Sequence, residues 1–189
     1  MLRKIATAYI LITVVALSVS SPALAVQWET LKTKYLTLYY HSDKDLDTFD
    51  KKIKPVEKMS RFSSFSSGNF YEGPRGDLAK KVDTLVEKVQ LILDMRKPIK
   101  INVRIYPDKA ALKRAYFRIY KNKKDLRAWY IFEYNTVYLQ VGDLFSGMFA
   151  HEVAHAIVDH YLDVRPPRAT SEILARYVDA HLNKEATVY

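Results

Sequence analysis

The chain has no cysteine, and this absence removes several classes of protein from consideration. Without cysteine there is no disulfide, no thiolate metal ligand and no cysteine nucleophile. Long apolar runs are also scarce: after Ala25, no stretch is long and apolar enough to span a membrane. The remaining composition, 49% apolar and 27% charged among 189 residues, is typical of a globular protein. It excludes disordered, collagen-like and low-complexity chains, and the length predicts one domain.

The segment Met1–Ala25 has the pattern of a secretory signal peptide. Arg3 and Lys4 supply positive charge, an uncharged apolar run covers 5–19, and Ala23-Leu24-Ala25 places small residues at the cleavage site. The alternative is an uncleaved membrane anchor, but an apolar run of about 15 residues is short of the roughly 20 that span a bilayer. We therefore predict cleavage near Ala25 and a secreted or periplasmic mature domain that covers 26–189.

Positive charge is concentrated in the first part of this mature chain. Residues 26–127 hold 24 Lys and Arg against 13 Asp and Glu, whereas residues 128–189 hold 4 against 8. The densest segment, Lys109–Arg127, contains eight Lys and Arg. This segment is either a patch that binds an anionic polymer or membrane surface, or a solvated helix face with its loop. No nucleic acid partner is expected, because the chain is predicted to be exported.

Hydrophobic periodicity predicts an α+β fold, with a small mixed β-sheet packed on helices. The expected strands are Tyr35–Tyr40, Ile99–Tyr106, Ala128–Glu133 and Thr136–Val141, the last two paired as a hairpin around Tyr134-Asn135.

Five helices are expected between and after these strands. They cover Asp43–Met59, ending near Pro55 or a little beyond, then Asp77–Met95, the segment from Pro107-Asp108 to Tyr120, the segment from Asp143 to Tyr161, and the segment from Thr170 or Ser171 to Asn183. The expected N-caps are Asp77, Asp143, and Thr170 or Ser171.

The residues that carry chemistry are in the fourth of these helices. His151-Glu152-Val153-Ala154-His155 is an HExxH motif, which composition alone would produce in roughly 0.5% of shuffled chains. Two imidazoles four residues apart lie on the same helix face and can share one metal ion. The Glu152 carboxylate, next to the first histidine, can take a proton from a water on that ion.

A catalytic zinc site needs a third protein ligand, and Glu172 is the candidate. It lies in the first turn of the next expected helix, beyond a Pro166-Pro167 connector that allows the chain to reverse. Antiparallel packing of the two helices would bring its carboxylate against the two histidines. The same carboxylate could also belong to a capping box, and the two roles are compatible.

Together, His151–His155 and Glu172 resemble the gluzincin branch of HExxH metallopeptidases, and the mature chain resembles the small exported peptidase MA-like domains. The segments that carry this wider resemblance are Trp28–Thr33, Ile101–Tyr106, Asn135–Leu139, the HExxH motif and Pro167–Tyr177. Only the HExxH motif and the Glu172-Ile173-Leu174-Ala175 segment are specific. The resemblance implies a Zn²⁺ cofactor held by His151, His155 and Glu172, and a peptide or protein substrate in the cell envelope or outside the cell. It also implies that Thr136–Val141 lies at the sheet edge, where an extended peptide could add to it.

Four departures from the family pattern stand out. The family's tryptophan falls on Ala169 or Thr170, and its glycine falls on Ile173. In better-known gluzincins an acidic residue one turn after the third ligand braces a ligating histidine, but this chain has Arg176 there. Asp159 and Asp179 are the candidate replacements. The residue that hydrogen-bonds the oxyanion has no clear counterpart; the candidates are Tyr161, Tyr177, His160 and His181.

Two functions follow from these residues. The first is an exported zinc metalloendopeptidase, in which zinc activates a water and polarises the scissile carbonyl while Glu152 is the general base. The second is a non-proteolytic, zinc-containing cell-envelope module that docks on anionic surfaces through its basic half. The intact Glu152 favours the enzyme, because a structural zinc site has no use for a general base.

Overall fold

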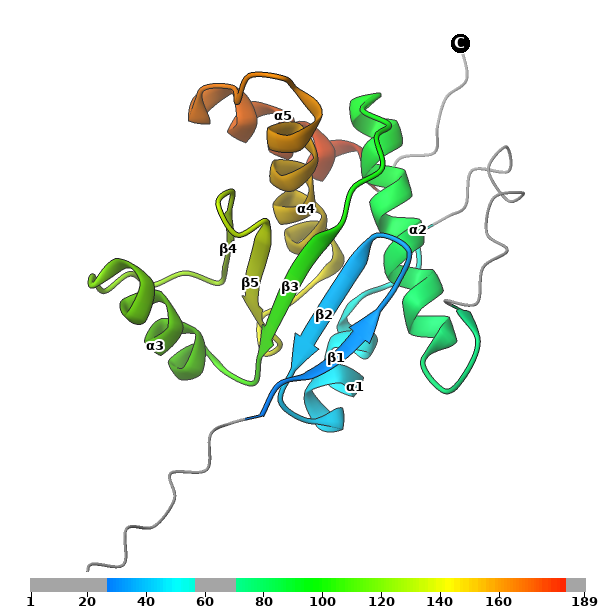
Figure 1. The fold of residues 1–189 in the computed structure, drawn as a ribbon, viewed down its shortest axis with the longest axis vertical. Coiled ribbons are helices and arrows are strands. Elements are labelled where there is room, and N and C mark those ends of the chain that lie inside the picture. Colours follow the sequence, from blue (N-terminus) through cyan, green and yellow to red (C-terminus); the bar gives the residue numbers. More distant parts are fainter. Residues whose placement is uncertain (1–26, 57–70, 183–189) are drawn as a thin grey trace, which may run out of the picture.

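A computed structural model describes residues 27–56 and 71–182 of the chain. The predicted signal peptide therefore lies outside the described residues, as do the last residues of the helix expected over Asp43–Met59. The described part is an α+β structure with one five-stranded mixed sheet and five helices (Figure 1). No helix in these ranges is long and apolar enough to cross a membrane.

The sheet has the strand order β1-β2-β3-β5-β4. The strands are β1 (Glu29–Lys32), β2 (Leu36–Tyr40), β3 (Ile101–Tyr106), β4 (Ala128–Ile131) and β5 (Thr136–Gln140). The three inner strands β2, β3 and β5 are mutually parallel, and the outer strands β1 and β4 each pair antiparallel with their neighbour. The sequence pattern does not predict β1 as a separate strand.

One expectation about the sheet was wrong. The resemblance implies an edge position for Thr136–Val141, but β5 lies between β3 and β4, and the strand at that edge of the sheet is β4. The physical reason is visible in the burial: every residue of β5 is buried, as in a strand covered on both faces, whereas burial alternates along β4. The expected hairpin between β4 and β5 is confirmed. Its turn includes Asn135 at φ 41°, a left-handed conformation that asparagine tolerates better than most residues.

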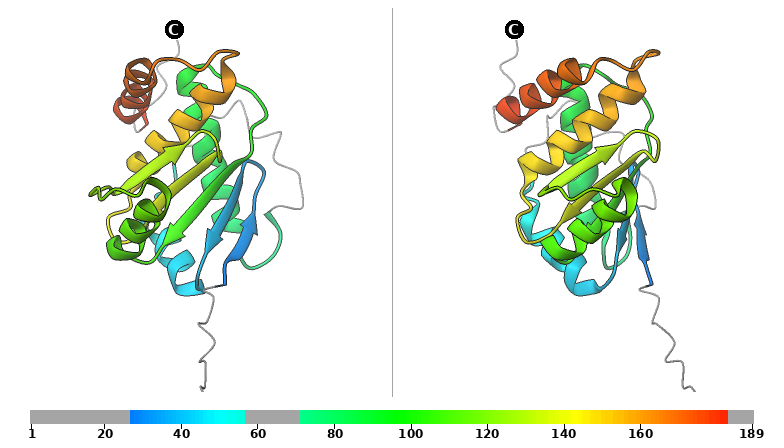
Figure 2. Two further views of the ribbon diagram at one scale, coloured as in Figure 1. Left: turned by 60° about the vertical axis from the view of Figure 1, so that its left-hand side comes forward. Right: turned by 90° about the vertical axis from the view of Figure 1, so that its left-hand side faces the viewer.

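The helices cover the two faces of the sheet unequally (Figure 2). One face carries α1 (Asp43–Lys52), α2 (Gly76–Leu93) and α4 (Ser146–Tyr161), with α5 (Arg168–His181) packed on α4. Among the described residues, the other face is covered only by α3 (Lys109–Tyr120), which packs its Leu112 and Ala115 against Trp129 and Tyr138. The largest core cluster thus lies on the α4 side of the sheet.

The helix ends differ in places from the expected ones. Helix α3 opens at Pro107-Asp108 as predicted, and Asp108 caps it by accepting a hydrogen bond from the backbone N–H of Ala111 at 2.7 Å. Helix α1 ends at Lys52 rather than at Pro55 or beyond, because a proline disfavours helical backbone in the residue before it. The expected N-caps were wrong: α2, α4 and α5 begin after Arg75, Phe145 and Pro167, none of which makes a side-chain cap bond.

Candidate metal centre

Helix α4 holds the two histidines rigidly. Phe149, Val153 and Ile157, spaced four residues apart, are buried in the core cluster on the sheet side of the helix. Phe149 also packs edge-to-face on Phe49 of α1, with ring centroids 5.5 Å apart. His151 and His155 lie on another face of α4, the one that meets α5, because both of their Nδ1 atoms bond to α5 side chains.

Helix α5 brings the third candidate ligand to the same place. Ala175, Val178 and Leu182 are buried in the core cluster, and they fix α5 across α4 (Figure 2). Glu172 lies one turn before Ala175, near the start of α5. The short connector after α4 lets the chain reverse, as predicted from Pro166-Pro167.

His151, His155 and Glu172 form a compact cluster in which all three ligand atoms lie within 4.8 Å of one another. The two Nε2 atoms are 3.2 Å apart, and Glu172 Oε2 lies 3.5 Å from His155 Nε2 and 3.8 Å from His151 Nε2. Ligand atoms that hold zinc tetrahedrally at about 2.0–2.2 Å are roughly 3.3–3.5 Å from one another. The three side chains, all partly exposed to solvent, therefore have a spacing that fits a zinc ion with little rearrangement.

Hydrogen bonds on the far side of each ring orient the histidines. Asp179 Oδ2 lies 2.9 Å from His151 Nδ1, and an ionised carboxylate can only accept, so Nδ1 carries the proton. Ser171 Oγ lies 2.9 Å from His155 Nδ1 and can accept in the same way. This arrangement leaves an Nε2 lone pair of each ring directed at the shared space. Two lone pairs so close together repel each other unless a cation or a proton lies between them.

The local electrostatics separate the ionisable groups of the cluster. Burial, reinforced by the nearby His151, lowers the pKa of His155 to about 4 and keeps its imidazole neutral, as a ligand must be. Burial and the charges of Glu172 and Asp179 raise the pKa of Glu152 to about 8. A bound dication would add an opposing charge that favours the ionised Glu152 carboxylate.

Arg176 has a different role from the acidic residue whose place it takes. Its Nε donates to Glu172 Oε1 at 3.0 Å, so one carboxylate oxygen of Glu172 is held while Oε2 faces the histidines. Although burial opposes it, this hydrogen bond and the two histidines lower the pKa of Glu172. The histidine brace comes from Asp179, one turn further along α5, which is one of the two candidates.

The other candidate brace, Asp159, does not contact a histidine of the cluster. Its buried carboxylate accepts a hydrogen bond from Arg165 Nε at 3.0 Å and holds the connector between α4 and α5. Sequence reasoning predicts Ser171 only as a helix cap and misses its contact with His155. One feature of the sequence could have predicted this contact. A ligating histidine needs an acceptor for the N–H of its second ring nitrogen, and Ser171 is adjacent to the third candidate ligand.

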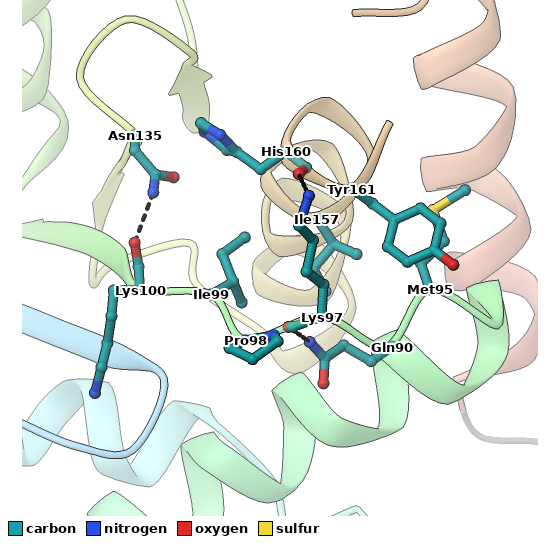
Figure 3. A pocket seen from close by; sticks show the side chains of 10 residues that line it. All are labelled: Gln90, Met95, Lys97, Pro98, Ile99, Lys100, Asn135, Ile157, His160 and Tyr161. Atoms are coloured by element: carbon teal, nitrogen blue, oxygen red, sulfur yellow. Dashed lines mark hydrogen bonds between the residues drawn. The ribbon is translucent and has the colours of Figure 1, made fainter. Parts of the chain in front are cut away.

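None of the four oxyanion candidates makes a hydrogen bond, an ion pair or a ring contact with the cluster within the described residues. His160 Nε2 shares a 2.8 Å hydrogen bond with the Tyr130 hydroxyl on β4, and His181 stacks on Tyr177. Tyr161 and His160 also line a separate pocket of about 260 Å³ (Figure 3). There the His160 carbonyl accepts from Lys97 Nζ at 3.3 Å, and no member of the cluster lines the pocket.

Comparison of the chain with protein-family models, with curated proteins and with solved structures finds no match. The function is therefore inferred from the cluster itself and from the sheet edge that packs against α4.

Proposed function

We propose that the protein is a zinc-dependent endopeptidase with a zincin-like arrangement, in which His151, His155 and Glu172 hold the ion. The observation that supports this most strongly is the spacing of the three ligand atoms, 3.2, 3.5 and 3.8 Å, with a hydrogen-bond partner behind each histidine. Two nitrogens and one oxygen leave a coordination position open, as catalytic zinc sites require.

Glu152 is the chain's own reacting group in this proposal. When bound, zinc would supply Lewis-acid chemistry, lowering the pKa of a water and polarising a carbonyl. Glu152 takes the proton of the attacking water and later passes it to the leaving amine. Glu152 follows His151 on α4, the helix whose ligand face meets α5. This position keeps its carboxylate near the cluster without making it a ligand.

The edge strand β4 gives this chemistry a place for the substrate. Among the described residues β4 pairs only with β5, so its outer edge offers backbone N–H and C=O groups to an extended peptide. Strand β4 packs against α4 and is tied to it by the hydrogen bond between Tyr130 and His160. A peptide added there would run beside the helix that carries His151 and His155. The substrate class is therefore an extended segment of a peptide or an unfolded protein.

One observation favours a second function, a zinc-containing binding module without peptidase activity. The four polar side chains that could stabilise an oxyanion make no hydrogen bond, ion pair or ring contact with the cluster in the described residues. This alternative predicts a bound metal without hydrolysis.

Metal analysis followed by cleavage of a broad peptide library distinguishes the two functions. The enzyme predicts about one zinc per chain, peptide cleavage, loss of cleavage on chelation and recovery when zinc is returned. Zinc without cleavage would support the binding module, and absence of zinc would contradict both.

A further inference from the structure

Helix α3 presents an outward face that the fold does not use. Its inner side is fixed by Leu112 and Ala115, which are buried against the sheet. The opposite side projects away from the sheet and away from α4 and α5, which lie on the other face (Figures 1 and 2). A partner on this side of α3 would leave the metal centre uncovered.

The cations on this face are not neutralised within the described residues. Arg114, Arg118 and Lys121 are exposed, follow one another at helical spacing, and have no carboxylate within ion-pair distance there. Lys109 and Lys113, by contrast, both pair with Asp125. Lys121 is the residue that caps the C-terminus of α3, so Lys124 lies beyond the helix and outside this stripe. The uncompensated stripe therefore has three cations.

Aromatic side chains lie among these cations instead of in the core. Phe117 is 47% exposed and Tyr120 is 45% exposed. On a helix, the surface neighbours of Phe117 are the residues three and four positions away, here Lys113, Arg114, Tyr120 and Lys121. The phenyl ring thus projects into solvent from the middle of a set of long cationic side chains. A half-exposed phenyl ring among cations without carboxylate partners matches a partner that is both anionic and apolar.

We propose that the outward face of α3 binds an anionic lipid surface. A bilayer supplies both properties in a fixed order, with phosphate charges outside and hydrocarbon beneath. Arg114, Arg118 and Lys121 would stay at the phosphates while the Phe117 ring enters the boundary of the acyl chains. An acidic protein or polymer would satisfy the cations but offers no such layer for the ring. Membrane binding would position the metal centre over the surface, facing away from it.

Vesicle co-sedimentation tests this proposal on the chain from Val26 onward, which contains every residue of the described core. Vesicles of phosphatidylcholine with a quarter phosphatidylglycerol should bind the protein at low salt, and pure phosphatidylcholine should not. Binding should weaken steeply as salt rises, because exposed charges are screened over about 8 Å at physiological ionic strength. Failure of the wild type to bind the anionic vesicles at low salt would overturn the proposal.

Two sets of variants separate the charge from the ring. Neutralising Arg114→Gln, Arg118→Gln and Lys121→Gln together should weaken binding by roughly 100-fold, at about fivefold per cation. The matched control neutralises three exposed cations on the other side of the sheet, Lys44→Gln, Lys51→Gln and Lys80→Gln, and should have little effect. Phe117→Ala should weaken binding about tenfold through the lost apolar contact. Its control, Val164→Ala, removes exposed apolar surface from the connector after α4.

The results also distinguish a lipid from another anionic partner. If binding depends on the three cations but Phe117→Ala binds as the wild type does, the ring makes no contact with lipid and the proposal is wrong. If the α3 triple variant and its control triple variant lose binding equally, the net charge of the protein alone is responsible. That result also contradicts the proposal. Thermal unfolding and zinc content of each variant should match the wild type, because every substituted side chain is exposed.

Discussion

The contact between Asp179 and His151 gives the sharpest quantitative prediction about the metal centre. Asp179→Ala removes the carboxylate that accepts from His151 Nδ1 at 2.9 Å and leaves all three proposed ligands in place. Removal of such an outer partner generally weakens metal binding by about 10- to 100-fold, or about 1.4–2.7 kcal/mol. Because the Asp179 side chain is 43% exposed, water screens part of its charge. We therefore expect the lower half of this range, about 10- to 30-fold.

The measurement is a zinc competition titration against a chromophoric chelator at constant pH. Asp179→Asn should show a smaller loss than Asp179→Ala, since its amide oxygen can still accept the proton while the charge is gone. Asp163→Ala is the matched control: it removes the same charge from the exposed connector between α4 and α5, where Asp163 has no bonded partner among the described residues. Unchanged affinity in Asp179→Ala, or an equal loss in Asp163→Ala, would refute the assigned role of Asp179.

Three further predictions concern ligands, ion binding and the fold. His155→Ala and Glu172→Ala should each lose most of the zinc measured by elemental analysis, because two ligands remain; stoichiometric zinc in both variants would contradict the ligand set. Zinc at about 100 times its dissociation constant should raise the stability of the wild type by about 2.7 kcal/mol in thermal unfolding. An equal rise in the stability of His155→Ala at the same zinc concentration would mean that zinc binds elsewhere. Asp83→Ala should lower the free energy of unfolding, measured by urea titration, by about 3 kcal/mol. The reason is that its buried carboxylate accepts four hydrogen bonds, from Thr33 Oγ1, the N–H groups of Lys34 and Tyr35, and the Tyr71 hydroxyl. A loss below about 1 kcal/mol would show that this network contributes little.

The elements that the sequence predicted well are those with a local cause. The start of α3 at Asp108 and the hairpin turn at Asn135 depend on side chains that act within a few residues. The HExxH spacing likewise places His151 and His155 on one face of α4 whatever the rest of the chain does. The position of Glu172 followed from a helix, a connector and a second helix that are consecutive in sequence.

What the sequence did not predict depends on contacts between distant segments. Whether β5 lies at an edge or in the middle is decided by its pairing with β3, which no local pattern specifies. The role of Ser171 depends on where α5 crosses α4, and a hydroxyl at a helix start looks the same whether it caps or braces. Asp159 and Asp179 were both candidates for the histidine brace, and the contacts that separate them, Asp179 with His151 and Asp159 with Arg165, join segments that the sequence pattern does not place together.

The proposed function requires that Glu152 and the metal held by His151, His155 and Glu172 hydrolyse peptide bonds together. The most direct test compares wild type with Glu152→Gln, which keeps the shape of the side chain but cannot take a proton, in peptide hydrolysis at equal zinc content. We predict that Glu152→Gln retains its zinc and loses hydrolysis by several orders of magnitude, since the base and the metal-activated water act as a unit. Equal hydrolysis by the two proteins would contradict the proposal.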